Sequence, residues 1–140
     1  MSEAFRVEVR SVDGGPTALG WGGSVTVVID RPVAAGGRGL GFNGGQLLNL
    51  AVAGCVSNDL FREAANRGIR LDRVRVGADS DYTGRPGITN LIEYEVDLAG
   101  DASEEALAEL VAYVDGIAEI PNSIRKGTEV RLRSVSATPG

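Results

Sequence analysis

The stretch that decides the fold is GFNGGQLLNLAVAGCVSNDLFREAANRG, residues 41–68. Its apolar run predicts one helix over residues 46–67, about 33 Å long, which ends before Gly68, a residue that favours a helix C-terminus. The first half of this helix is apolar on every face, and such a helix is buried all round. A chain of 140 residues offers little to cover it, so we expect a second copy of the chain to supply part of the cover.

Outside the helix, apolar and polar residues alternate in several segments, as they do in half-buried strands. Before the helix, the alternation predicts strands over residues 5–10 and 25–29, with an irregular strand over 18–21 between them. After the helix, it predicts strands over 73–78 and 92–98. The outer faces of these two strands carry basic and acidic side chains respectively, which indicates that they pair with each other.

The C-terminal third of the chain predicts a second helix, a short helical turn and a last strand. Asp101 and Glu104 form a capping-box pattern in front of an amphipathic helix over residues 107–117. The helical turn is predicted over 121–127, because its proline suits a helix start and its glycine suits a helix end. An alternating segment at 130–132 predicts the last strand.

The length and composition suit one globular domain. The chain has 140 residues, of which 43% are hydrophobic and 24% charged, and these are ordinary values for a folded domain. The order β-β-(β)-α-β-β-α-β, without a linker or repeat, predicts a single α+β domain over residues 1–140. No apolar run is long enough to span a membrane, and residues 1–10 lack a signal-peptide core. We therefore expect a soluble, cytoplasmic protein with no membrane partner.

The residue counts exclude several kinds of chemistry. Because the chain has no histidine, it has no Ser-His-Asp triad, no Cys-His dyad and no His-ligated metal. Its single cysteine, Cys55, excludes an intrachain disulfide and a Cys-based zinc site. We expect neither a metal nor a cofactor. The net charge of −5 argues against a nucleic-acid partner.

Residues 36–45 form a glycine-rich loop, in which Gly39, Gly41 and Gly44 match the pattern G-x-G-x-x-G. A dinucleotide site needs a strand that runs directly into the first glycine and an acid at the end of the next strand. Here a loop intervenes, and Asp59 lies inside the predicted helix. The pattern therefore favours a flexible loop, or one that approaches another backbone closely. The helix start that follows can still hold an anionic group.

Cys55 lies in the middle of the apolar helix, where a cysteine is usually an inert hydrophobic residue. Asn58, Asp59 and Arg62 share its face, however, and polar groups in an apolar helix need partners. This face is therefore predicted to border a wet pocket or an interface. Arg62, or a loop arginine such as Arg38, would favour the thiolate form that a reactive cysteine requires, whereas Asp59 would oppose it.

The segment GFNGGQLLNLAVAGC, residues 41–55, resembles the OsmC/Ohr family. The family pattern is a Gly-x-Asn-Pro turn, one or two glutamates, an apolar helix and then an Ala/Gly-Cys pair. The strand order and the segment EIPNSIRKGTEV, residues 119–130, fit as well, so the resemblance covers nearly the whole chain. It implies an intertwined homodimer with two long helices packed centrally, sheets wrapped around them and sites at the interface.

The resemblance also implies a thiol peroxidase chemistry. In working members, an organic hydroperoxide oxidises a cysteine on the long helix to a sulfenic acid, a second cysteine forms a disulfide with it, and a thiol reductant restores both. An arginine held by a glutamate stabilises the thiolate. Cys55 occupies the position of the reactive cysteine.

The sequence departs from the family pattern in two places. Ile120 stands where the second cysteine would be, so a sulfenic acid here needs an external thiol. Gly45 or Gln46 stands where the glutamate would be, and neither can form an ion pair with arginine. The family arginine does not map onto one residue, and we take Arg38 as the first candidate and Arg31 as the second.

Two functions agree with these observations, and whether the protein is an enzyme stays open. The first is a divergent one-Cys, thiol-dependent organic hydroperoxide reductase, in which Cys55 is the nucleophile, Arg38 assists and an external thiol is the reductant. The alternative is a family member that has lost this chemistry and binds or transforms a small apolar or weakly anionic molecule in the pocket of the homodimer. The predicted substrate-binding residues are Asn43, Gln46, Asn58, Asp59 and Asn122.

Overall fold

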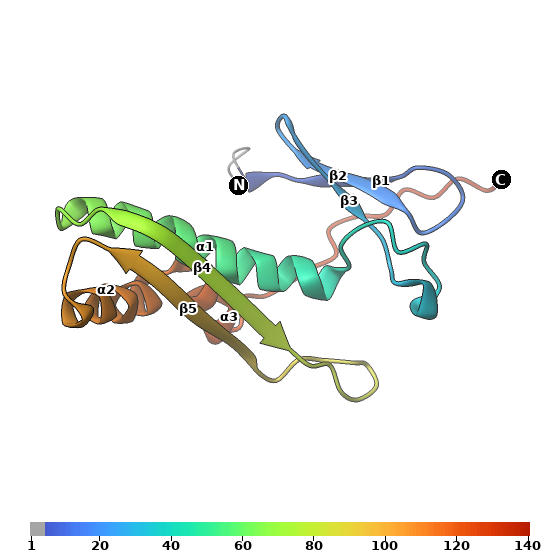
Figure 1. The fold of residues 1–140 in the computed structure, drawn as a ribbon. Helices are drawn as coiled ribbons and strands as arrows, with labels where there is room; N and C mark the ends of the chain where they lie inside the picture. Colours follow the sequence, from blue (N-terminus) through green and yellow to red (C-terminus); the bar gives the residue numbers. More distant parts are fainter. Residues whose placement is uncertain (1–4) are drawn as a thin grey trace. The chain divides into compact units, whose positions relative to one another are not determined.

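In the computed structural model, which describes residues 5–140, three strands precede a long helix, and two strands and two helices follow it (Figure 1). The contacts divide the chain into two compact units. In the described part, the first unit comprises residues 5–51 and 78–94, and the second comprises 52–77 and 95–140. The long helix and the two strands after it run through both units. This element order confirms the α+β fold class.

An antiparallel three-stranded sheet in the order β1-β2-β3 lies in the first unit. Its strands are β1 (Glu8–Ser11), β2 (Ala18–Gly22) and β3 (Val25–Ile29). The strand predicted as irregular over 18–21 is therefore a regular central strand. The half-burial predicted for the first strand is not found within one chain, whereas three of the five residues of β3 are half-buried. Val7 and Val25 are 71% and 72% exposed, so a single chain leaves much of the apolar side of the sheet uncovered.

The glycine-rich loop docks onto β3 through its backbone. The Phe42 N–H donates to the Val28 carbonyl at 3.0 Å, and the Asp30 N–H donates to the Phe42 carbonyl at 3.0 Å. A Cβ atom at Gly41 would collide with the Val28 carbonyl, so only glycine fits here without a shift of the backbone. The structure confirms that the loop approaches another backbone closely.

The long helix α1 spans Gly44–Asn66, and a 3-10 helix, η2 (Val33–Ala35), precedes it. The helix starts at Gly44 instead of Gln46 because two side chains cap it reciprocally. The side-chain oxygen of Asn43 accepts the Gln46 N–H at 2.9 Å, and that of Gln46 accepts the Asn43 N–H at 3.0 Å. This is a capping box with asparagine and glutamine in its two positions.

One chain buries only one face of α1. Leu50 and Phe61 are 48% and 49% exposed, so the predicted burial on all sides is not found within a single chain. The physical reason is that the chain carries too few elements to cover a second face of a helix this long. The buried apolar residues follow one another at a spacing of four and are Val52, Val56, Leu60 and Ala64.

The strands β4 (Leu71–Ser80) and β5 (Ile92–Gly100) follow α1 and pair as a two-stranded sheet. Across this pair, Nη2 of Arg73 lies 3.1 Å from Oδ1 of Asp97. The ion pair confirms the pairing that the basic and acidic faces predict.

The helix α2 (Glu104–Ile117) begins at a different cap from the predicted one. The Ser103 hydroxyl accepts a backbone N–H of the first turn at 3.1 Å and is the N-cap. Asp101 is not the cap, because its Oδ1 accepts the Arg70 N–H at 2.6 Å instead. The predicted capping box is therefore wrong, although the helix predicted to follow it is present.

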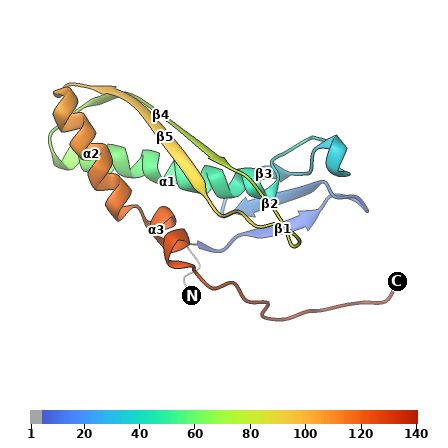
Figure 2. The same cartoon turned by 90° about the horizontal axis from the view of Figure 1, so that it is seen from below.

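The chain ends with α3 (Glu119–Lys126), which stops at Gly127 in the left-handed conformation, where the sequence predicts its end. The strand predicted over 130–132 is not formed. Residues 128–140 have no regular secondary structure (Figure 2), and Val130 and Leu132 are 93% and 83% exposed. An alternating segment becomes a strand only when another strand supplies its hydrogen bonds, and one chain supplies none here.

Candidate functional site

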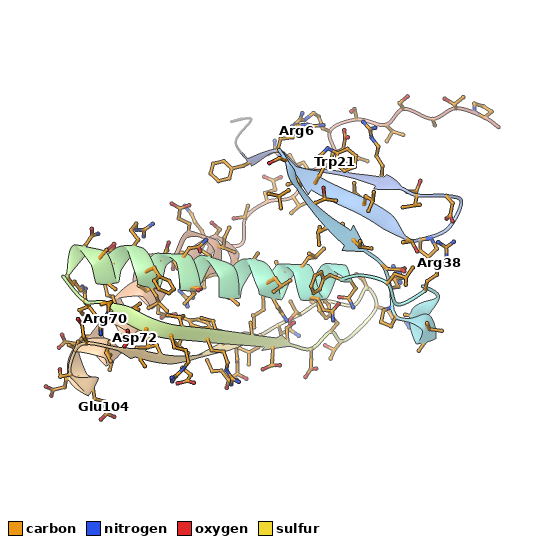
Figure 3. The ribbon with its side chains drawn as sticks, turned by 45° about the horizontal axis from the view of Figure 1, so that its top comes forward. Arg6, Trp21, Arg38, Arg70, Asp72 and Glu104 are labelled. Atoms are coloured by element: carbon orange, nitrogen blue, oxygen red, sulfur yellow. The ribbon has the colours of Figure 1, made fainter. Side chains whose placement is uncertain are left out.

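Arg38 lies in the loop that leads into α1 (Figure 3), and a carboxylate holds its guanidinium group. Nη2 of Arg38 donates to Oδ1 and Oδ2 of Asp13 at 3.1 and 3.0 Å, and Nη1 donates to the Thr17 hydroxyl at 3.1 Å. The hydrogen bond from Arg38 is the main reason why the pKa of Asp13 lies below its ordinary value. Both charged side chains are about half exposed, so a small reactant can reach this pair.

A buried carboxylate, Asp30, fixes the path of the same loop and is only 2% exposed. Its oxygens accept four hydrogen bonds of 2.7–3.2 Å, from the Thr17 hydroxyl and from the backbone N–H groups of Arg31, Arg38 and Leu40. Burial opposes the ionisation of Asp30, but these hydrogen bonds outweigh it and hold the pKa of Asp30 below its ordinary value. The Thr17 hydroxyl accepts a hydrogen bond from Arg38 and donates one to Asp30. It therefore connects the Arg38–Asp13 ion pair with the buried carboxylate of Asp30.

Replacing Asp30 by asparagine is expected to lower the thermal midpoint at neutral pH, because an amide NH₂ would face N–H groups that now donate to a carboxylate. The native pKa of Asp30 lies below its unfolded value. Its contribution to stability is therefore present above about pH 4 and is lost as the pH falls through the native pKa. Thermal midpoints measured from pH 7 downward should fall more steeply for the wild type than for D30N.

The control for this experiment is Asp81→Asn, at an exposed carboxylate in the loop after β4. This variant should keep the acid profile of the wild type. If D30N and the wild type lost stability over the same pH range and by the same amount, the carboxylate of Asp30 would not hold the loop.

Asn43 and Gln46, two of the predicted substrate-binding residues, have a structural task at the start of α1. Their side-chain oxygens accept each other's backbone N–H groups. The pattern Asn-x-x-Gln signals this capping box in the sequence, and the sequence prediction overlooked it. Gln46 thus uses its carbonyl oxygen within the helix start.

Cys55 is a free, partly exposed thiol on α1. On the same helix, Asp59 is 7% exposed, and its Oδ1 lies 3.1 Å from Nη1 of Arg62. Nε of Arg62 lies 3.3 Å from Oε2 of Glu63. The hydrogen bond to Glu63 and the charge of Asp59 raise the pKa of Arg62, so this arginine is committed to two carboxylates. Asn58 is exposed.

Asn122 connects α2 with α3. Its Nδ2 donates to the Gly116 carbonyl at 3.0 Å, and its Oδ1 accepts from Nη1 of Arg125 at 3.1 Å. Both ends of the amide therefore take part in the helix corner. That Asn122 also contacts a substrate stays a prediction.

The predicted site residues divide between the two units. Arg31, Arg38, Asn43 and Gln46 belong to the first unit, and Cys55, Asn58, Asp59 and Asn122 belong to the second. Within residues 5–140, only Asn43 and Gln46 of this set are hydrogen-bonded to each other. The residues of the site that the sequence prediction missed are Asp13, Thr17 and Asp30, and they lie in the first unit.

Two further classes of feature are absent from the described part of the chain. No group of three or more histidine, cysteine, aspartate or glutamate side chains there could hold a metal ion. None of the helices there combines the length and the hydropathy needed to cross a membrane.

The family model described as OsmC-like protein matches residues 36–133. This match covers α1, the two-stranded sheet and both C-terminal helices, so the chain belongs to the OsmC family. A search of curated proteins by sequence gives no match.

Solved structures share this fold at low sequence identity. An OsmC-like protein from Mycoplasma pneumoniae is 14% identical with a TM-score of 0.75, and the match covers 91% of each chain. An organic hydroperoxide resistance protein OsmC from Legionella pneumophila is 20% identical with a TM-score of 0.60, and the match covers 86% of this chain and 88% of that one. An organic hydroperoxide resistance protein from Elizabethkingia anophelis is 16% identical with a TM-score of 0.60, with 86% and 87% covered.

Proposed function

We propose that this OsmC-family protein reduces organic hydroperoxides, with Cys55 as its reactive thiol and an external thiol as its reductant. The observation that carries the proposal is the held arginine in the loop before α1. Asp13 and Thr17 fix the guanidinium of Arg38, so the chain has a carboxylate-held cation although positions 45 and 46 carry no acid. The fold that it shares with proteins named for organic hydroperoxide resistance supports the same function.

The proposed cycle has three steps. The thiolate of Cys55 attacks one oxygen of the hydroperoxide, the O–O bond breaks, and the alkoxide takes up a proton to leave as an alcohol. The sulfur is thereby oxidised by two electrons to a sulfenic acid. An external thiol then attacks this sulfur and releases water, which gives a mixed disulfide. A second external thiol then attacks the mixed disulfide, forms a disulfide with the first external thiol and restores the Cys55 thiol.

Arg38 has the role of a cation that favours the thiolate and the developing alkoxide. A guanidinium is always charged and donates several hydrogen bonds in a fixed geometry, so it suits both anions. Asp13 keeps the guanidinium of Arg38 in place, although its negative charge also weakens the positive potential around that guanidinium. We propose that Arg38 acts on Cys55 in the assembled protein, from the same chain or from a second copy.

Replacing Arg38 by glutamine is expected to reduce the reactivity of Cys55. Without the cation, alkylation by iodoacetamide and oxidation by cumene hydroperoxide should both slow about tenfold at pH 7, because both reagents react with the thiolate. The measurement is the rate of thiol loss against pH with each reagent. Arg73→Gln is the matched control, because Arg73 is also an exposed arginine paired with an aspartate.

Comparing the rates of thiol loss with the two reagents decides whether the proposal holds. Fast oxidation that prefers the hydroperoxide and depends on Arg38 supports a one-Cys peroxidase. Slow and unselective oxidation, equal in the wild type, R38Q and R73Q, contradicts it. In that case the chain keeps the OsmC fold without the redox chemistry.

We also propose that the protein is a homodimer. Leu50 and Phe61 leave an exposed apolar stripe on α1, and Val130 and Leu132 alternate in an exposed C-terminal segment. Exposed apolar surface of this kind is stabilised when it is buried. A second copy of the chain would bury both surfaces. Sedimentation at micromolar concentration should give twice the mass of one chain, and the mass of a single chain would exclude the dimer.

The second candidate function is binding of a small molecule without redox chemistry. It is favoured by Ile120, which removes any second thiol from the position where the family pattern has one. A pocket in the first unit also supports it. The thiol-loss experiment discriminates between the two functions, since a pure binding protein needs no reactive cysteine.

A further inference from the structure

A pocket of about 420 Å³ lies in the first unit beside the start of α1. Its volume is within the range of small-molecule sites. Its walls combine aliphatic and proline residues with one cation, one phenol, the carboxylate of Asp30 and the amide of Asn43. We call it the Arg31 pocket, and the lining groups that matter are Pro16, Ile29, Pro32, Ala35, Arg31 and Tyr82.

Arg31 gives this pocket a permanent positive charge. Its side chain is exposed, and within residues 5–140 it has no ion-pair partner, whereas Arg38 of the same loop is held by Asp13. Asp30 also lies in the wall, but its oxygens already accept the four hydrogen bonds that order the loop. The guanidinium of Arg31 is therefore the charged group still available to a ligand.

Tyr82 closes one side of the pocket because residue 45 is glycine. A Cβ atom at Gly45 would lie 3.2 Å from Cε2 of Tyr82 and 3.4 Å from its hydroxyl oxygen. The ring therefore rests against the bare backbone of the helix. This places an aromatic face and a hydroxyl donor in the wall, from a loop that is distant in sequence from Arg31.

We propose that the Arg31 pocket binds a small organic monoanion, with a carboxylate on Arg31 and a short apolar body against the proline and aliphatic walls. A guanidinium pairs well with a carboxylate because its planar N–H groups match the two oxygens. Arg31 is the one cation in the wall and the ionised Asp30 is an anion beside it. The second negative charge of a dianion such as a phosphate monoester would therefore have no cation to pair with, so a dianion fits less well. This proposal rests on the second candidate function, whose pocket it assigns to a class of ligand, and it does not depend on Cys55.

Calorimetric titration of the full chain carrying Cys55→Ser tests this site, because that variant removes the thiol chemistry. Octanoate is the probe, 1-octanol is its neutral counterpart and octyl phosphate is the dianionic one. Octanoate is expected to saturate one site per chain and to bind more tightly than either. Arg31→Gln should weaken octanoate about tenfold, as the loss of one charge-assisted contact implies.

Two further variants make the result specific. Ala35→Phe places a ring in the pocket and should weaken octanoate and octanol alike, while Arg73→Gln, outside the pocket, should bind octanoate as tightly as the parent. Three outcomes overturn the proposal: equal affinity for octanoate and octanol, unchanged octanoate affinity in R31Q, or tighter binding of octyl phosphate. Octanoate binding by a wild-type protein that does not reduce hydroperoxides contradicts only the peroxidase proposal.

Discussion

Cys55→Ser is expected to reduce the thiol-dependent consumption of cumene hydroperoxide to the rate without protein. The nucleophile of the proposed cycle is a thiolate. A serine hydroxyl is a poor nucleophile unless a base activates it, and the chain has no histidine to serve as one. The effect should therefore be a complete loss of catalysis. Hydroperoxide consumption with excess external thiol, followed by peroxide assay, measures it.

In the wild type, the corresponding measurement is the oxidation product formed on the Cys55 sulfur. Mass spectrometry after peroxide treatment should find one added oxygen on Cys55, or a mixed disulfide there when the external thiol is present. C55S should fold as the wild type does, because the two side chains have nearly the same shape, and its thermal midpoint checks this. Turnover in a correctly folded C55S would place the chemistry elsewhere.

Gly41→Ala is expected to lower the stability of the protein strongly. The added methyl group would collide with the Val28 carbonyl, which accepts the hydrogen bond that docks the loop onto β3. Backbone cannot rotate away as a side chain can, so the loop has to move. We expect a cost of about 2–3 kcal/mol, seen as a thermal midpoint lowered by roughly 5–10 °C.

Gly44→Ala is the control for this experiment. A Cβ atom at Gly44 would meet no atom within 4 Å, and alanine is a better helix former than glycine. G44A should therefore be as stable as the wild type or slightly more so. If G41A and G44A melted at the same temperature, the close approach of the loop to β3 would not hold it.

The parts of the fold that could be predicted are those whose signal is local. The long helix is encoded by its own apolar run and by Gly68, and its extent was right to within two residues at its start. The strand over 130–132 fails for the opposite reason. Its alternation is genuine, but its partner must come from elsewhere, and a pattern in one segment does not show whether that partner exists.

The site was less predictable, because its contacts join distant residues. Arg38 was named from the sequence, yet the carboxylate that holds it, Asp13, lies 25 residues earlier. An arginine-rich, acidic chain offers many such pairs, and nothing local distinguishes the one that forms. The aspartate that orders the loop was missed too, since Asp30 reads in sequence as an ordinary strand end.

The way in which Asp30 orders its loop also matters for protein engineering. Asp30 recognises backbone N–H groups, which every residue except proline possesses. The identities of the side chains at 33–35 and 40 are therefore free to change, provided that Asp30, Gly37 and Gly41 are kept. A library randomised at these positions would display new side chains on a constant frame, as binding loops do on antibody scaffolds, and could redirect the neighbouring pocket to ligands chosen by selection.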